Sequence, residues 1–303
     1  MIGCGFFVAN MANDEVIQAV VISSVNADVP VLEEALVALD LTPSSYASLE
    51  TGKANTFLVE ESEAAARQRA SQLDEYLASW KELLSAPIEI DVQEMRKEDW
   101  ANSWKKNFHT FKASDRLVVK PGWEEYEAKP GEIVLPIDPG MCFGTGYHGT
   151  TRACLYFLDK LQAKHGTMSF IDAGTGSGIL SIGAALLGYK PIQAFDNDPQ
   201  CITTSMENME RAGVSGIHVT CAPLGGFVPV QAADVVAANI LAVVLIKQRE
   251  AVLSLARPGG YMILSGILAA NYDEILEAFQ PLGCIELERV TNEEWTSGLF
   301  RRP

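Results

Sequence analysis

The sequence predicts an α/β fold in which a parallel sheet, covered by helices on both faces, follows a smaller α/β module. From about residue 168, short apolar segments alternate with helical segments, which is the pattern of a parallel sheet. A glycine-rich turn joins the first of these segments to the first helix. The smaller module is marked by charge, because residues 1–100 carry 18 acidic and 6 basic side chains, which gives −12 of the net charge of −16.

The composition limits the class of protein. Of 303 residues, 48% are hydrophobic and 20% are charged, which is typical of a globular protein and excludes intrinsic disorder. The net charge of −16 argues against general binding to nucleic-acid phosphates or to a membrane surface. The longest apolar run, residues 235–246, is interrupted by Asn239 and is shorter than the ~20 residues that span a bilayer. The six cysteines and four histidines show no metal-binding spacing, so we expect reduced thiols, no metal and a cytoplasmic location.

The first module is predicted to hold strands and helices in the order βαβ-βαβ on one small sheet. Residues 16–25 are β-branched and apolar enough for a strand, and residues 31–39 are apolar at helical spacing. Residues 55–59 and 88–92 predict two more strands. Between these two strands, residues 62–84 predict a long helix with Ser62 as its N-cap and with Pro87 beyond its end.

These elements divide the chain. We expect a small α/β domain over residues 1–61, a linker helix with its connecting strand over residues 62–93, and a large domain over residues 94–303. The first ten residues show no pattern, so they are expected to be disordered or to precede a functional start at Met11. In the large domain, strands are predicted over 168–173, 191–196, 217–221, 233–238, 261–265 and 285–290, and helices near 179–188, 200–212, 242–256 and 272–279.

The glycine-rich turn is the strongest local signal for a ligand. Its glycines are Gly174, Gly176 and Gly178, and they follow the apolar strand that ends at Ala173. Glycines permit positive φ and a close approach of the backbone to a ligand, and the helix that follows offers free N–H groups. A dinucleotide turn has the spacing G-x-G-x-x-G, but Ile179 stands where its third glycine belongs.

Two further polar residues lie where apolar strands end. Asp196 comes 22 residues after Gly174, which is the reach of one βαβ unit, and its carboxylate can accept the two hydroxyls of a ribose. Asp198 is expected to cap the helix that begins near Pro199. Asn239 ends the fourth strand and points to the same edge, but Leu241 and Ala242 follow it where a base-stacking aromatic residue is expected, which disfavours a nucleobase substrate.

The G-x-G-x-G spacing resembles that of the class I S-adenosylmethionine-dependent methyltransferases. Longer motifs resemble the PrmA family, the bacterial methyltransferases that modify protein L11 of the ribosomal stalk base. The matching segments are D-W-x-x-x-W at 99–104, D-P-G-x-x-F-G-T-G-x-H-x-T-T at 138–151, N-I-L-A at 239–242, S-G-I-L at 265–268 and E-E-W at 293–295. The chain departs from the family at Tyr147 and Gly149, where Thr and Pro are usual, and at Thr175, where Cys is usual.

This resemblance implies a Rossmann-like, seven-stranded class I methyltransferase sheet, preceded by the small domain as a substrate-recognition domain. It implies donor binding by Thr151, Gly174, Gly176, Asp196 and Asn239, with Asn239 also catalytic. The implied cofactor is S-adenosylmethionine, and the implied partner is the basic ribosomal protein L11, methylated on lysine ε-amines and at its N-terminal amine. No carboxylate follows the third strand, where Cys221 lies, so the adenine-binding residue stays unassigned.

A lysine amine must be neutral to attack, and with a pKa near ~10.4 its deprotonation at pH 7 costs about 4–5 kcal/mol. No general base is evident in the motifs, so we assign catalysis to alignment, with Asn239 as a neutral acceptor for the amine. Three alternatives stay open: a methyltransferase for another protein lysine or a small amine, a non-catalytic ribosome-assembly module, and an NAD-dependent oxidoreductase, which Ile179 opposes.

Overall fold

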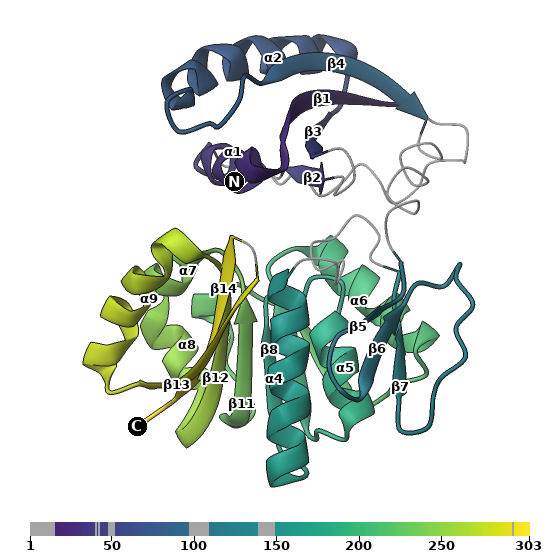
Figure 1. Cartoon of the computed structure of the whole chain (residues 1–303), viewed down its shortest axis with the longest axis vertical. Coiled ribbons are helices and arrows are strands. Elements are labelled where there is room, and N and C mark those ends of the chain that lie inside the picture. The colour runs from purple at the N-terminus through teal and green to yellow at the C-terminus, as the bar shows by residue number, and fades with distance from the viewer. Residues whose placement is uncertain are drawn as a thin grey trace. The chain divides into compact units, whose positions relative to one another are not determined.

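A computed structural model describes residues 16–39, 41, 43–47, 52–96, 109–138, 149–292 and 294–303. The chain forms two compact units, with the boundary between Asn107 and Phe108. Figure 1 shows the elements of both units. The predicted boundaries after residues 61 and 93 differ from this division, because the second helix and the strand after it pack within the first unit.

The first unit is a four-stranded antiparallel sheet with two helices. The sheet order is β2-β3-β1-β4, and every strand pair in it is antiparallel. In chain order the elements are β1 (Val16–Val25), α1 (Val29–Val37), β2 (Ser44–Ala47), β3 (Lys53–Glu60), α2 (Glu63–Leu77) and β4 (Glu89–Arg96). The βαβ-βαβ order predicted from the sequence is therefore confirmed, and β2 is a strand that the sequence patterns did not reveal.

Helix α2 begins where the sequence predicted. The Ser62 side chain accepts a hydrogen bond from the Ala65 backbone N–H, so Ser62 is the N-cap. The helix ends at Leu77, seven residues earlier than predicted, and a 3₁₀ turn continues to Trp80. Its apolar face, which includes Leu73, packs on the β1 residues Val20 and Ile22. By these contacts the predicted linker helix belongs to the core of the first unit.

The second unit is built on a seven-stranded sheet with the order β10-β9-β8-β11-β12-β14-β13, in which β14 runs antiparallel to both of its neighbours. The sheet and helix elements are α4 (Gly149–His165), β8 (Phe170–Ala173), α5 (Ile179–Leu187), β9 (Ile192–Asp196), α6 (Pro199–Arg211), β10 (Ile217–Cys221), β11 (Ala233–Asn239), α7 (Ala242–Lys247), α8 (Arg249–Leu255), β12 (Ala256–Leu268), α9 (Tyr272–Phe279), β13 (Ile285–Asn292) and β14 (Trp295–Arg301). This is the mostly parallel α/β sheet that the sequence predicted.

Both faces of the seven-stranded sheet are covered, which explains why its central strands are apolar throughout. On β11, Val235 and Ala237 pack with α4, α5 and α6, whereas Val236 and Ala238 pack with α7, α8 and α9. The predicted helix over residues 242–256 is two helices that meet at Gln248. Within the described residues, no helix combines the length and the apolar character needed to cross a bilayer.

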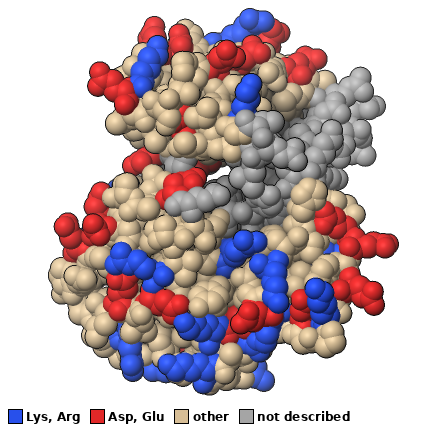
Figure 2. Space-filling model, viewed as in Figure 1, with Lys and Arg blue, Asp and Glu red and all other residues tan. Residues whose placement is uncertain are grey.

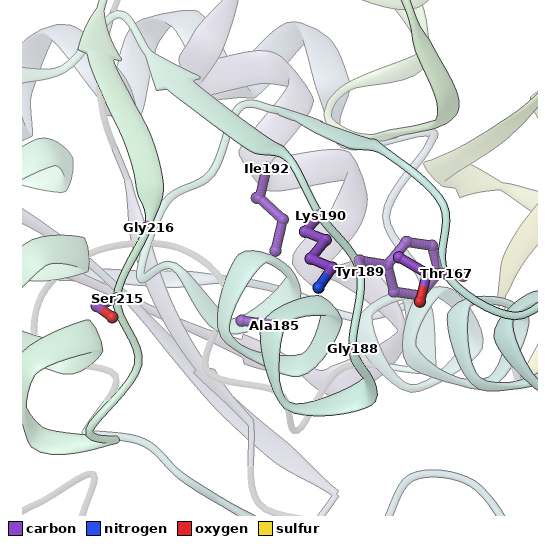
Figure 3. Close-up of a pocket in the computed structure, with 8 residues that line it drawn as sticks. All are labelled: Thr167, Ala185, Gly188, Tyr189, Lys190, Ile192, Ser215 and Gly216. Atoms are coloured by element: carbon purple, nitrogen blue, oxygen red, sulfur yellow. The ribbon is translucent and has the colours of Figure 1, made fainter.

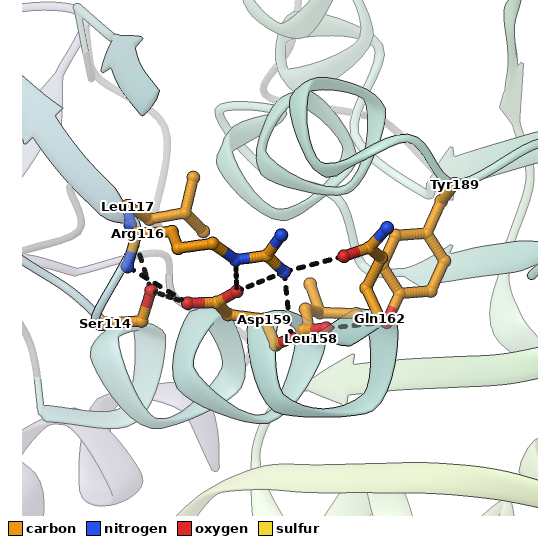
Figure 4. A network of polar contacts seen from close by, with 7 residues as sticks. All are labelled: Ser114, Arg116, Leu117, Leu158, Asp159, Gln162 and Tyr189. Carbon is orange, nitrogen blue, oxygen red and sulfur yellow. Dashed lines mark hydrogen bonds and ion pairs between the residues drawn. The ribbon is translucent and has the colours of Figure 1, made fainter. Parts of the chain in front are cut away.

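A three-stranded sheet that the sequence analysis missed packs against α4. Its strands are β5 (Phe111–Lys112), β6 (Leu117–Lys120) and β7 (Ile133–Pro136). Asp159 on α4 anchors it, because this carboxylate accepts hydrogen bonds from the Ser114 hydroxyl and from Arg116 Nε, at 2.5 and 2.6 Å (Figure 4). The Arg116 guanidinium also donates to Gln162 at 2.6 Å. A buried carboxylate is thus fully partnered, so this network is a structural anchor.

Candidate donor-binding site

The glycine-rich turn lies between β8 and α5 and has the backbone that its sequence predicted. Gly174, Gly176 and Gly178 have φ values of +75°, +52° and +84°. A Cβ added to Gly174 would lie 2.5 Å from Ile240 Cγ2, so the turn passes close to the residue that follows Asn239. The turn therefore needs glycine for both its conformation and its contact with the end of β11.

A fully buried carboxylate, Asp172, lies on β8 two residues before the turn. Its Oδ2 accepts hydrogen bonds from the hydroxyls of Thr175 and Ser181 at 2.8 and 2.7 Å, and from the Ser181 N–H at 3.1 Å. Its Oδ1 is buried and has no hydrogen-bond partner among the described residues. Burial raises the pKa of the Asp172 carboxyl to about 6, against the lowering effect of these hydrogen bonds. An unpartnered buried oxygen of this kind suits a cationic or donor group of a ligand.

The second carboxylate, Asp196, is the last residue of β9, as predicted. Its Oδ2 accepts a hydrogen bond of 2.9 Å from the Gly176 N–H, and its Oδ1 accepts one of 3.0 Å from the Asp198 N–H. These two bonds hold the carboxylate beside the glycine turn. The predicted cap is confirmed as well, because the Asp198 side chain accepts from the Gln200 N–H at 2.8 Å at the start of α6.

The amide of Asn239 lies at the end of β11, against the first turn of α4. Its Nδ2 donates to the Thr151 hydroxyl oxygen at 3.3 Å, and Thr151 is fully buried. Its Oδ1 is buried with no hydrogen-bond partner among the described residues. The hydrogen bond from Nδ2 to Thr151 thus fixes the amide group, and the amide oxygen is available as a neutral acceptor.

The fold brings these predicted residues together at the edge of the sheet that is formed by the carboxyl ends of its parallel strands. Strands β9, β8 and β11 are neighbours, and all three run parallel. Their carboxyl ends therefore place Asp196, the glycine turn and Asn239 side by side, and Thr151 reaches Asn239 from α4. In open α/β sheets this edge is where ligands bind. Residues 139–148, which include Tyr147 and His148, and the predicted motif over 99–104 lie outside the described residues.

Asp172 had no predicted role. Its sequence did carry a signal, because an acidic residue in a buried, apolar strand two residues before a glycine turn is exceptional. The adenine-binding residue stays unassigned, since β10 is followed by Ala222, whose N–H donates to the Asp196 carbonyl at 2.8 Å. Among the described residues, no group of three or more His, Cys, Asp and Glu side chains is placed to hold a metal ion.

An open pocket of about 460 Å³ lies at the amino ends of β9 and β10 (Figure 3). Its lining includes Ile192, the first residue of β9, and Gly216, which directly precedes β10. Asp196 and Cys221 end the same two strands, so the pocket and the glycine turn lie at opposite ends of the strands. The pocket is therefore separate from the candidate donor site.

The strand order, the glycine turn and the acidic end of β9 define a class I S-adenosylmethionine-dependent methyltransferase. The family model described as ribosomal protein L11 methyltransferase (PrmA) matches residues 11–303. The chain therefore belongs to the ribosomal protein L11 methyltransferase family, as its motifs predicted. The nicotinamide-dependent alternative is thereby set aside.

Individual relatives agree with this assignment. The chain is 39% identical over 221 residues to the ribosomal protein L11 methyltransferase of Streptococcus agalactiae. The matched segment covers 73% of this chain and 69% of the relative. It is 40% identical over 245 residues to that of Citrifermentans bemidjiense, covering 77% of each chain. A crystal structure of ribosomal protein L11 methylase from Lactobacillus delbrueckii subsp. bulgaricus matches with a TM-score of 0.59 and 28% identity, over 65% of this chain and 100% of the other.

Proposed function

We propose that this protein transfers methyl groups from S-adenosylmethionine to amines of ribosomal protein L11, chiefly lysine ε-amines. The observation that carries the proposal lies at the carboxyl ends of β8 and β11. There, beside the glycine turn, two buried oxygens, Asp172 Oδ1 and Asn239 Oδ1, have no hydrogen-bond partner within the part of the chain that the structure describes. The relatives that share 39–40% identity with this chain are named for that substrate. Because the substrate is a ribosomal protein, we propose the cytoplasm as the place of action.

The residues at this edge fit the methyl donor. Asp196 accepts from the Gly176 N–H of the turn and from the Asp198 N–H, and it retains lone pairs for the hydroxyls of a ribose. Asp172 Oδ1 is a buried anionic acceptor, and the donor carries an ammonium group that would satisfy it. Gly174 and Gly176, which adopt positive φ, bring no side chain to this edge. Bound there, S-adenosylmethionine supplies an electrophilic methyl group on its sulfonium.

Asn239 is proposed to orient the attacking amine. An amide oxygen accepts a hydrogen bond but does not take a proton at neutral pH, so Asn239 Oδ1 can align a neutral amine without acting as a base. Thr151 holds the opposite end of the amide, which fixes the direction of Oδ1. The chain thus supplies alignment, and such alignment contributes several kcal/mol, up to about 7–11, in well-oriented reactions.

The first unit is proposed to recognise the protein substrate. On β4, Glu89, Asp91 and Gln93 are exposed, whereas Ile90 and Val92 face the helices, so this strand presents acidic side chains away from the core. On the face seen in Figure 2, acidic side chains outnumber basic ones on this unit. A ribosomal protein is basic, and complementary charge accelerates its encounter and sets its orientation. The competing interpretation is that these charges only solubilise the unit.

A labelled-donor assay tests the proposed function. The full chain is incubated with ribosomal protein L11 and S-adenosylmethionine labelled in its methyl group, and label in L11 is counted. Asp196→Asn should weaken donor binding, measured by calorimetry, about tenfold or more, because hydrogen bonds to a charged acceptor are worth roughly 1.5–3 kcal/mol. Asp234→Asn is the matched control, because Asp234 lies at the opposite end of β11 and its carboxylate binds Ser169.

Each alternative has its own outcome in this assay. Donor binding without label in L11, but with label in another protein or a small amine, would identify a different acceptor. Binding of L11 without donor binding would identify a non-catalytic assembly module.

A double variant tests whether the first unit recognises the substrate. Glu89→Gln and Asp91→Gln are combined, and the rate of methylation at limiting L11 should fall and lose part of its salt dependence. An unchanged rate would assign the acidity to solubility.

A further inference from the structure

The first turn of α4 is held by polar side chains from three different strands. Asn292, the last residue of β13, donates from Nδ2 to the Gly149 carbonyl at 3.2 Å. Ser265 on β12 donates from Oγ to the Thr150 carbonyl at 3.3 Å. Asn239, the last residue of β11, donates from Nδ2 to the Thr151 hydroxyl oxygen at 3.3 Å. Three consecutive residues of one helical turn are thus each bound to a separate strand at the same sheet edge.

Ser265 is itself held from β14, because the Ser265 and Ser297 hydroxyl oxygens lie 2.6 Å apart. Since Ser265 uses its hydrogen toward Thr150, Ser297 is the donor in this pair. Both serines are buried, at 0% and 1% exposure. Ser265 is also the register partner of Asn239 across β11 and β12. The bonds form away from water, where leaving a polar group unpaired is costly.

Gly149 makes the contact with β13 possible. A Cβ added at this position would lie 2.7 Å from Asn292 Cβ, so any larger residue would push the strand and the helix apart. The departure from the family's proline at Gly149 is therefore explained by the close approach of Asn292. Tyr147, the other departure in this segment, lies outside the described residues.

We infer that Ser265 and Ser297 are positioning residues for methyl transfer, which fix the first turn of α4 and, through Thr151, the direction of the Asn239 amide. The inference rests on the role proposed for Asn239. Among the described residues, the hydrogen bonds of these serines go to the Thr150 carbonyl, to each other and, from Ser265, to the Cys154 thiol; none goes to the glycine turn or to Asp196. Their loss should therefore affect alignment of the amine more than binding of the donor.

The test uses full-length Ser265→Ala and the milder Ser297→Ala, with Ser169→Ala as the matched control. Ser169 is a buried serine that bonds to Asp234 at the opposite sheet edge. Ser265→Ala should lower kcat about tenfold or more, because small misplacements of aligned groups have effects of this size or larger. The donor Kd should stay within about twofold. Ser169→Ala should lower stability and leave kcat unchanged.

A double-mutant cycle distinguishes positioning from a general loss of stability. If Ser265 acts through Asn239, Ser265→Ala combined with Asn239→Ala should be no slower than Asn239→Ala alone. Additive losses in kcat would overturn the inference, and so would normal kcat in both Ser265→Ala and Ser297→Ala. Normal activity of Asn239→Ala would overturn the role of Asn239 together with the inference.

The orientation of the Asn239 amide can also be measured directly, without an assay of methyl transfer. The side-chain amide signals of Asn239 are followed by NMR in ¹⁵N-labelled protein. They should shift or broaden in Ser265→Ala and stay in place in Ser169→Ala, even if L11 proves not to be the substrate. Unmoved Asn239 signals in both serine variants at the α4 edge would contradict the positioning role.

Discussion

Asp172→Asn should stabilise the protein without its donor while weakening donor binding. In the folded state the Asp172 carboxyl has a pKa of about 6, against 3.8 as the usual value, chiefly because it is buried. The folded state therefore binds a proton more tightly than the unfolded state. Stability falls as pH rises through the window from about 4 to 6, and the full penalty is present above pH 6.

The size of the penalty follows from the shift. A difference of about two pKa units corresponds to about 3 kcal/mol of unfolding free energy at pH 8, of which roughly half is present at pH 5. An asparagine can turn its oxygen to Ser181 and Thr175 and place its NH₂ group where Oδ1 of Asp172 lies. The hydrogen bonds to this oxygen are then weaker, because it is neutral and not part of a carboxylate. The net gain in the free energy of unfolding at pH 8 should therefore be about 1–2 kcal/mol.

Urea unfolding at pH 5 and pH 8 measures this gain, and calorimetry with S-adenosylhomocysteine measures ligand binding. Asp172→Asn should be more stable than the parent protein at pH 8, with a smaller difference at pH 5. Its ligand binding should be at least tenfold weaker, since the anionic oxygen proposed to accept from the ligand's ammonium group is replaced by part of a neutral amide. Asp159→Asn is the control with the opposite sign, because Asp159 is paired with Arg116 and its loss should cost about 1–3 kcal/mol. A variant of Asp172 that is less stable at pH 8 and binds the ligand normally would refute the reasoning.

Three further changes are expected to act through single, named contacts. Asp28→Ala should destabilise the first unit by about 1–3 kcal/mol in urea unfolding, because the buried carboxylate accepts from the Ser85 and Ala86 N–H groups at 2.7 and 3.2 Å; Asp28→Asn should recover part of the loss. Gly174→Ala should abolish measurable donor binding, since its φ is +75° and the added Cβ would lie 2.5 Å from Ile240; normal binding in calorimetry would contradict the proposed turn geometry. Ser62→Ala should cost about 1 kcal/mol through loss of the α2 N-cap, with activity unchanged.

The parts of the fold that sequence could predict are those set by local patterns. The strand over Ile217–Cys221 and the helix over Tyr272–Phe279 have the bounds that their patterns predicted, because apolar runs and helical periodicity are local properties. The positions of Asp196 and Asn239 at the ends of β9 and β11 could be predicted because each polar residue ends an apolar run; their binding roles stay proposals.

Other features depend on contacts between distant residues. The short strand β2 and the three-stranded sheet have too few residues for a periodic pattern, and pairing with neighbours defines them. The end of α2 at Leu77 and its place in the first unit follow from its packing on β1. The contacts of Ser265 join residues 115 and 32 positions apart, so no local pattern in the sequence could reveal them.

Mass spectrometry of ribosomal protein L11 tests the central claim most directly. Intact L11 is incubated with the full-length protein and with Asn239→Ala, each with isotope-labelled S-adenosylmethionine, and its peptides are then mapped. The account predicts labelled methyl groups on lysine side chains of L11 with the parent protein, and a large loss of label with Asn239→Ala although that variant folds and binds the donor. Unmodified L11 in the presence of a folded, donor-bound parent protein would contradict the assignment of this substrate.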